Sequence, residues 1–102
     1  MNIQSLLKQA QKMQKELEVI EKELETREYA ATVNQGDVNV VCNGAMQIQS
    51  LTIKEELIQE GDKEKIQDLV TTAVNAVLRK AVSDKNEVMK KATGGVKLPG
   101  GF

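Results

Sequence analysis

The first 24 residues carry a strict heptad of apolar side chains. Apolar residues recur at alternating intervals of three and four, at Ile3, Leu6, Ala10, Met13, Leu17, Ile20 and Leu24. The residues between them are mostly Gln, Lys and Glu. Such a narrow seam is typical of a helix that packs against another helix, not of one that lies on a broad core. The pattern therefore predicts a helical arm over residues 1–27 that needs a helical partner.

The apolar period changes after the arm, and residues 28–53 predict an antiparallel sheet of three strands in a meander. We expect strands at residues 29–34, 38–43 and 45–53, and the middle strand turns Val38, Val40 and Cys42 to one face. Asn43-Gly44 predicts a tight hairpin turn in which both residues have positive φ. The apolar phase of the third strand breaks between Ile48 and Leu51, which a β-bulge would explain.

The last third of the chain predicts a long helix over residues 62–93, after a short helical turn at 54–59. Asp62 is the expected N-cap. A wide apolar face at helical spacing should lie on the sheet, formed by Ile66, Leu69, Val70, Ala73, Val74, Val77, Leu78, Ala81 and Val82. Beyond Asp84 this face thins, so we expect the last turns to leave the core, and a flexible tail at 94–102. The order α–β–β–β–α defines a single α+β domain, residues 1–102, with long protruding helices.

The charges are distributed unevenly, although the net charge is only −1. Residues 1–15 carry +3, residues 16–62 carry −8, residues 63–78 balance, and residues 79–102 carry +4. The first helix enters the sheet by its C-terminal end and the last helix leaves it by its N-terminal end. If the two helices lie side by side, the two basic segments meet far from the sheet.

A two-fold homodimer would satisfy two needs of this arrangement. One main helix covers only one face of a three-stranded sheet, and the heptad seam requires a partner. Two basic arm ends per dimer would then flank a rod of negative charge such as double-stranded DNA.

Lys8, Lys12 and Lys15 recur at intervals of four and three and therefore share one helical face, which is not the seam. Such a row follows phosphates without reading bases, and its affinity falls steeply with salt. The aromatic content of 2% and the absence of an Arg-rich reading helix indicate weak base-specific readout. A solvated helix face explains the same lysines, and from the charges alone this alternative stays open.

The sequence lacks the residue types of most catalytic and metal sites. It has no histidine and one cysteine, Cys42, which excludes His-based catalysis and a zinc site. No glycine-rich loop matches a nucleotide-binding fingerprint. We therefore expect no enzyme, no cofactor and no small-molecule substrate, and we interpret Cys42 as a small apolar residue of the inner strand face. A reactive thiol at Cys42 is a remote alternative.

Membrane and export signals are also missing from the sequence. No run of about 18 apolar residues occurs, and the first residues lack the pattern of a signal peptide. The single cysteine fits a reducing compartment. We therefore expect a cytoplasmic protein without a membrane partner.

Four segments, in this order along the chain, carry a family resemblance. They are LKQAQKMQ at residues 7–14, VNVVCNGA at 38–45, DLVTTAVNAV at 68–77 and LPGGF at 98–102. On these segments the chain resembles the YbaB/EbfC family of small bacterial nucleoid-associated proteins. The family patterns are a Met/Lys/Gln-rich opening, V-x-V-x-x-N-G, D-L-V-x-x-A-x-N-x-A and L-P-G-F, and the last has one extra Gly here.

The resemblance implies a tweezer-like homodimer, in which a shared sheet body carries protruding helical arms that bind DNA at the nucleoid. In this interpretation the arms grip the backbone of double-stranded DNA, bridge or organise it, and influence gene expression. The basic positions that match are Lys8, Lys12 and Lys15 on the first helix and Arg79, Lys80, Lys85, Lys90 and Lys91 on the last.

A second class of function stays open from the residues alone. Helical arms around a β-hairpin body also resemble prefoldin, a coiled-coil chaperone, and a chaperone or interaction scaffold needs apolar arm ends. The predicted ends offer Ile3, Leu6, Leu7, Val88 and Met89. A salt series separates the two functions, because DNA binding weakens linearly in log salt and apolar client binding does not.

Overall fold

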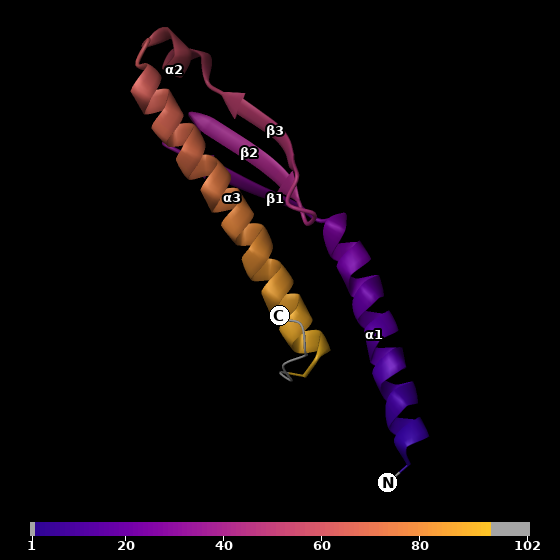
Figure 1. The fold of residues 1–102 in the computed structure, drawn as a ribbon. Coiled ribbons are helices and arrows are strands. Elements are labelled where there is room, and N and C mark those ends of the chain that lie inside the picture. Colours follow the sequence, from indigo (N-terminus) through magenta and orange to yellow (C-terminus); the bar gives the residue numbers. More distant parts are fainter. Residues whose placement is uncertain (1, 95–102) are drawn as a thin grey trace.

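The computed structural model describes residues 2–94 and shows an elongated molecule in which two long helices extend past one end of a small sheet (Figure 1). Its principal extents are 70 × 19 × 17 Å and its radius of gyration is 19.3 Å. A compact chain of this length would have a radius of gyration of about 13 Å. Much of the chain therefore lies outside any globular body.

The order of elements confirms the predicted α+β class. Helix α1 spans Ile3–Glu25, strands β1, β2 and β3 span Glu28–Val33, Val38–Asn43 and Ile48–Ile53, and helices α2 and α3 span Glu55–Gln59 and Lys63–Ala92. The strands form one sheet in the order β1-β2-β3, and both pairs are antiparallel. The predicted meander is therefore confirmed. The tail predicted at residues 94–102 lies, except for Gly94, outside the described residues.

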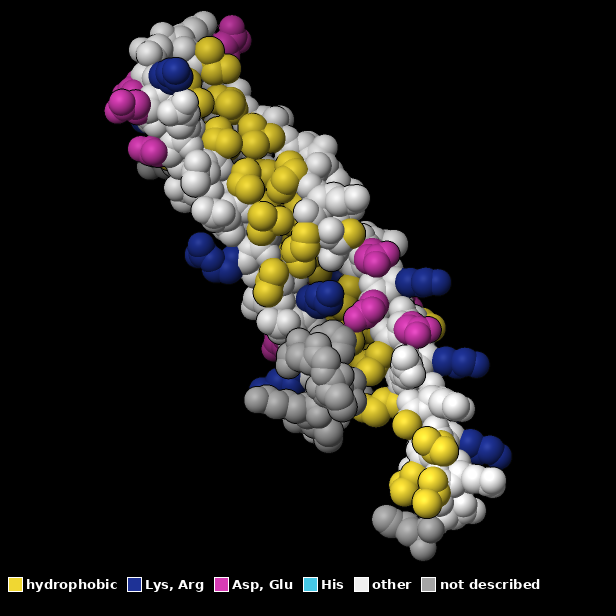
Figure 2. Space-filling model, viewed as in Figure 1, with side chains coloured by type: hydrophobic (Ala, Val, Ile, Leu, Met, Phe, Trp, Pro, Cys, Tyr) yellow, Lys and Arg dark blue, Asp and Glu magenta, His cyan; other side chains and the backbone are white. Residues whose placement is uncertain are grey.

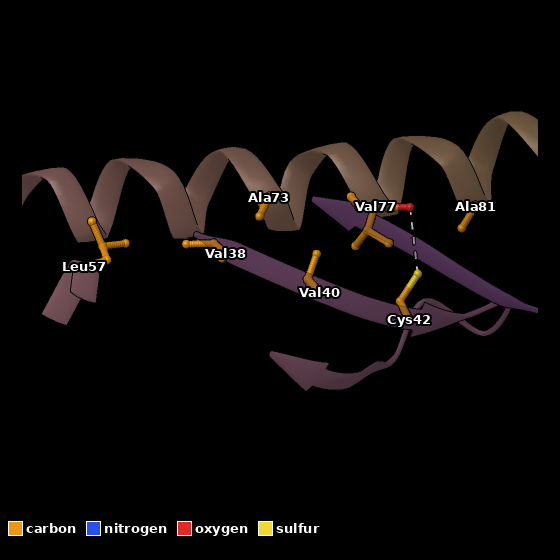
Figure 3. Packing of buried hydrophobic residues seen from close by; sticks show 8 residues of the cluster. Val38, Val40, Cys42, Leu57, Ala73, Val77 and Ala81 are labelled. Atoms are coloured by element: carbon orange, nitrogen blue, oxygen red, sulfur yellow. Dashed lines mark hydrogen bonds between the residues drawn. The ribbon is translucent and has the colours of Figure 1, made fainter. Parts of the chain in front are cut away.

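The main core lies between one face of the sheet and α3, which packs on β1 and β2. Every second residue of β2 points toward α3, and residues four apart on α3 point toward β2 (Figure 3). The side-chain repeat of the strand therefore packs against the side-chain repeat of the helix. Leu57 of α2 closes the end of this core near the start of α3. The buried residues are Ala31, Val38, Val40, Cys42, Leu57, Ala73, Val77 and Ala81.

Strand β3 carries the predicted bulge. Val41 pairs with Ser50, whereas the next residue, Cys42, pairs with Ile48, so Gln49 is the extra residue. The bulge returns Ile48 to the face that also carries Leu51, which explains the break in the apolar phase. Helix α3 does not cover β3, and both side chains stay largely exposed, Ile48 at 42% and Leu51 at 38%.

Both long helices begin at a side-chain cap, Asn2 for α1 and the predicted Asp62 for α3. The Asn2 side chain accepts a hydrogen bond from the Gln4 backbone N–H at 3.1 Å, and the Asp62 side chain accepts one from Lys65 N–H at 3.1 Å. Each bond satisfies an amide that the first helical turn leaves without a partner. At 1.5 Å per residue, α1 is about 35 Å long and α3 about 45 Å.

A second, smaller core joins the two long helices. Leu17 and Leu24 of the heptad seam pack on Met89 of α3, with Met13, Ile20 and Val88 around them. The expectation that the last turns of α3 leave the core is therefore wrong for Met89, which is 1% exposed. The two helices run in opposite directions (Figure 1). The C-terminal half of the α1 seam packs against α3.

The turn between β2 and β3 differs from its prediction. Neither Asn43 nor Gly44 has positive φ; the positive φ of this connection is at Met46, 63°. The connection spans residues 44–47, and the Asn43 side chain accepts hydrogen bonds from the Ala45 and Gln47 amides. Residue 44 is glycine for another reason, because a Cβ there would overlap the carbonyl group of Leu24 in α1.

We expect Gly44→Ala to lower the free energy of unfolding by about 3 kcal/mol, near the upper end of the usual cost of overpacking, because backbone lies on both sides of the clash. Urea unfolding followed by circular dichroism measures the change. Gly36→Ala is the matched control, because a Cβ at Gly36 meets nothing within 4 Å, although its φ of 94° adds some strain. Equal costs at the two positions would contradict the close-approach explanation.

Candidate nucleic-acid interface

The three lysines predicted on the arm lie together on the exposed surface of α1. Heptad spacing places them on the side of the helix opposite the apolar seam. Figure 2 shows the same separation, with basic side chains projecting from one edge of α1 and a hydrophobic cluster on the other side of its free end. Together with neighbouring polar residues they line a shallow surface hollow formed by Lys8, Gln11, Lys12, Gln14, Lys15 and Glu18.

The five predicted cations of α3 fall into two groups. Lys90 and Lys91 are exposed side chains in the last turn of α3, where the negative end of the helix dipole favours cations. Arg79, Lys80 and Lys85 precede this turn, in the part of α3 where Lys80 reaches β1 and Lys85 lies beside the β2–β3 turn. We call these three residues the sheet-side group. At 1.5 Å per residue, about 18 Å separate Arg79 from Lys91 along the axis.

Two cations of the sheet-side group already have other contacts. Lys80 Nζ donates a hydrogen bond to the carbonyl oxygen of Ala30 in β1 at 2.7 Å. Lys85 is half-buried and lines a crevice that also contains Glu21 and Glu25 of α1. These side chains therefore brace the body, whereas the side chains of the arm lysines and of Lys90 and Lys91 make no hydrogen bond or ion pair within residues 2–94.

The antiparallel packing of α1 on α3 brings the two basic ends to the same end of the molecule (Figure 1). Within residues 2–94 the ion pairs are Arg27–Asp84 and Lys65–Glu60. None of the eight predicted DNA-contacting residues therefore forms an ion pair in that range. The charges of the arm lysines and of Lys90 and Lys91 are therefore available to an external anion.

A polar cluster that the sequence did not reveal holds the arm to the body. Asp84 of α3 accepts hydrogen bonds from the Arg27 guanidinium at 2.9 Å and from the Tyr29 hydroxyl at 2.5 Å. The bond from Tyr29, supplemented by Arg27, holds the pKa of Asp84 below its usual value. Burial, followed by the bond to Asp84, raises the pKa of Tyr29 to about 12. The partners are more than 50 residues apart in the chain, so no local pattern indicates the cluster.

The single cysteine is part of the core and not of the interface. Cys42 is buried beneath α3, where its sulfur donates weakly to the Val77 carbonyl at 3.8 Å. Burial raises the pKa of the thiol, which disfavours the reactive thiolate. Over residues 2–94, acidic, Cys and His side chains form no group of three suited to a metal ion. None of the helices in that range is long and apolar enough to cross a bilayer.

The fold and the surface thus define a small elongated α+β protein with a basic helical arm. The family model of the YbaB/EbfC DNA-binding family matches residues 1–96. The chain belongs to this family.

Curated relatives match the chain over almost all of its length. A protein named nucleoid-associated protein from Clostridium kluyveri is 45% identical, and the match covers 99% of this chain and 89% of that one. A nucleoid-associated protein from Clostridium acetobutylicum is 42% identical, with 97% and 88% covered. The crystal structure of an uncharacterized protein from Helicobacter pylori shares the fold, with a TM-score of 0.78, 22% identity, and 89% of this chain and 96% of that one covered.

The Asp84 cluster predicts a pH-dependent contribution to stability. Because folding lowers the pKa of Asp84, its contribution is present above the unfolded value of about 3.9 and is lost as the pH falls through the folded value. We expect Asp84→Asn to lower the free energy of unfolding by about 1 kcal/mol at pH 7, and the difference from wild type to shrink below about pH 4.

Urea unfolding of both proteins at pH 7 and pH 3 measures this difference. Glu87→Gln removes an exposed acid from the same helix and serves as the control, with little effect expected at either pH. A cost of Asp84→Asn that is the same at both pH values would show that the carboxylate charge is not the source.

Proposed function

We propose that this protein is a non-enzymatic, nucleoid-associated protein that grips the backbone of double-stranded DNA with its basic arms and organises DNA in the bacterial cytoplasm. The observation that carries the proposal is the division of α1 into two faces, an apolar seam and an opposite row of exposed lysines at Lys8, Lys12 and Lys15. The family supplies the DNA-binding class, and the curated relatives support the nucleoid association.

The proposed mode of binding is electrostatic and largely independent of sequence. Lysine ammonium groups on a helix surface reach phosphates, whereas base readout requires side chains that enter a groove. An aromatic content of 2% leaves almost no stacking residues. Lys90 and Lys91 would add charge near the arm, and an influence on gene expression would follow from occupancy of DNA rather than from recognition of a long site.

We infer a homodimer from the uncovered side of the body. The exposed Ile48 and Leu51 share the α3-side face of the sheet. On α3, a row of apolar side chains four residues apart shares one side of the helix and is not fully buried, namely Val70, Val74, Leu78 and Val82. Figure 2 shows a hydrophobic band along the body. Strand β3 also carries no charged residue, so its edge has none of the usual protection against pairing.

A second copy is the occupant that this surface fits. A two-fold axis at the β3 edge would pair each apolar strip with its own copy and cover both at once. It would also place two arms on one assembly, so that a duplex between them meets two rows of lysines. Two rows raise the effective concentration of one arm once the other is bound.

The chaperone alternative retains one supporting observation, the apolar free end of α1. Ile3 is 71% exposed and Leu7 is 57% exposed. Binding of a client protein through these side chains would persist at high salt, whereas contacts with phosphates weaken as the salt concentration rises.

We expect the double variant Lys8→Glu/Lys12→Glu to abolish retention of duplex DNA in a gel shift, because it replaces two attractive charges with two repulsive ones on the proposed contact face. The oligomeric state, measured on a sizing column, should not change. Lys54→Glu/Lys63→Glu makes the same charge change near α2, at the far end of the molecule, and should retain most of the affinity. Equal losses in both variants would contradict the site, and unchanged affinity in the first would overturn it.

The dimer surface has its own test. Leu51→Glu should convert the dimer to a monomer in sedimentation velocity, because it places a charge in the proposed interface. Thr52→Glu puts the same charge on the neighbouring residue of β3, which faces the other side of the sheet, and should leave the dimer intact. A dimer that survives Leu51→Glu would contradict this interface.

A further inference from the structure

From Ile3 to Ala10 the α1 seam has no covering partner among the described residues. The seam packs on α3 only as far as Met13, and α1 then continues beyond the last turn of α3 (Figure 1). Ile3 is 71% exposed, Leu6 is 46% exposed, and Ala10 is also exposed. We call residues 3–14 the α1 tip. A heptad seam is specified for a helical partner, so its exposure here points to a partner outside the chain.

The two halves of α1 differ in the charge of the side chains that flank the seam. Positions e and g flank a heptad seam and decide which helices can approach it. In the α1 tip these positions hold Leu7, Gln9 and Gln14, none of which is charged. In the half covered by α3 they hold Glu16, Glu21 and Glu23. A second α1 would be repelled by the acidic half, but it meets no like charge at the tip.

The lysines of the tip do not oppose such a contact either. Lys8, Lys12 and Lys15 fall at the outermost heptad positions, c and f, on the side away from the seam. Figure 2 shows the hydrophobic cluster of the tip and the basic side chains on opposite sides of α1. A contact through the seam would therefore leave the proposed DNA-facing lysines exposed.

We propose that the α1 tips of two dimers pair with each other in antiparallel orientation, as a short two-helix coiled coil that links one DNA-bound dimer to another. Dimers that face each other across two duplexes would bring their arms together from opposite directions, which gives the antiparallel orientation. In that register Leu6 lies opposite Ala10 of the second copy at the centre of the contact. At its ends Ile3 lies opposite Met13, the half-buried residue at which the contact with α3 stops. The pairing of Leu6 with Ala10 occurs twice by symmetry and each time combines a large residue with a small one. This arrangement lets the side chains interdigitate.

The contact between two tips is short, so the pairing depends on the local concentration of arms. Eleven residues of overlap span about 15 Å, and isolated helical contacts of that length are marginal in water. The pairing is therefore weak between free dimers and becomes populated where DNA raises the local concentration of arms. This linking step rests on the proposed DNA binding, whereas the self-association of the tips does not.

Sedimentation equilibrium without DNA tests the pairing on the full chain. We expect wild type to show a weak concentration-dependent association above the dimer, and Leu6→Gln to weaken that association about tenfold or more, because two leucines per contact lose their apolar burial. Val19→Gln is the matched control, since Val19 is 57% exposed on α1 but lies off the seam, and it should associate as wild type does. An association that Leu6→Gln leaves unchanged, or the absence of any association above the dimer, would overturn the proposal.

Other occupants of the seam give different outcomes. If residues 95–102 cover the tip, the full chain will not associate above the dimer, and association will appear only when these residues are deleted. If the two tips of one dimer pair with each other, Leu6→Gln will alter the dimer and no larger species will appear. Either result would contradict pairing between dimers.

A bridging assay then tests the link to DNA, with one duplex fixed to beads and a labelled duplex in solution. Leu6→Gln should lose most of the recovered label while its gel-shift affinity for a single duplex stays within about twofold of wild type. Equal recovery by both proteins would overturn the bridging role. Absence of gel-shift binding by wild type would overturn the proposed function instead, and the sedimentation result would still decide the tip pairing.

Discussion

The contact between the β2–β3 turn and the end of α1 controls where the arm points. Gly44 lies against the Leu24 carbonyl with no room for a side chain, and its amide donates to the Arg27 carbonyl at 3.1 Å. Arg27 and Tyr29 then reach Asp84 of α3, which ties the same junction to the other long helix. With its base held at these points, α1 can pack Leu17 and Leu24 on Met89 and project the rest of its length past the body.

The division of α1 by length and by face organises the proposed functions. Its C-terminal half uses the seam within the chain, against α3, and is flanked by acids. Its N-terminal half leaves the seam uncovered from Ile3 to Ala10 among the described residues and carries lysines on the outer face. In this account α1 has three separate surfaces: the C-terminal seam packs on α3, the outer lysines face phosphates, and the N-terminal seam is an apolar strip. No side chain is needed for two of these roles.

Features set by neighbours in the chain could be predicted from the sequence. The cap at Asp62, the inward face of β2 and the bulge in β3 all depend on local spacing, and the structure confirms them. The role of Gly44 could not be predicted, because its requirement comes from Leu24, which is distant in sequence, and not from its own turn. The same holds for the Asp84 cluster and for Met89, whose partners come from α1 and β1.

The candidate site shows the same division. The row of Lys8, Lys12 and Lys15 follows from helical spacing alone, so the sequence already places it on one face. A charge count cannot tell which cations of α3 are engaged, because Lys80 binds a carbonyl of β1 and Lys85 sits beside acids of α1 only once the fold has formed. The assignment of individual lysines to phosphates stays a prediction.

The salt dependence of DNA affinity tests the central claim, that the arm lysines neutralise phosphates. The slope of log affinity against log salt counts the phosphates neutralised, at about 0.9 per contact on duplex DNA. If Lys8, Lys12 and Lys15 each hold a phosphate, changing all three to Gln should reduce the magnitude of the slope by about 2.7 per arm engaged. A triple variant with the same slope as wild type would show that these lysines do not contact the DNA backbone.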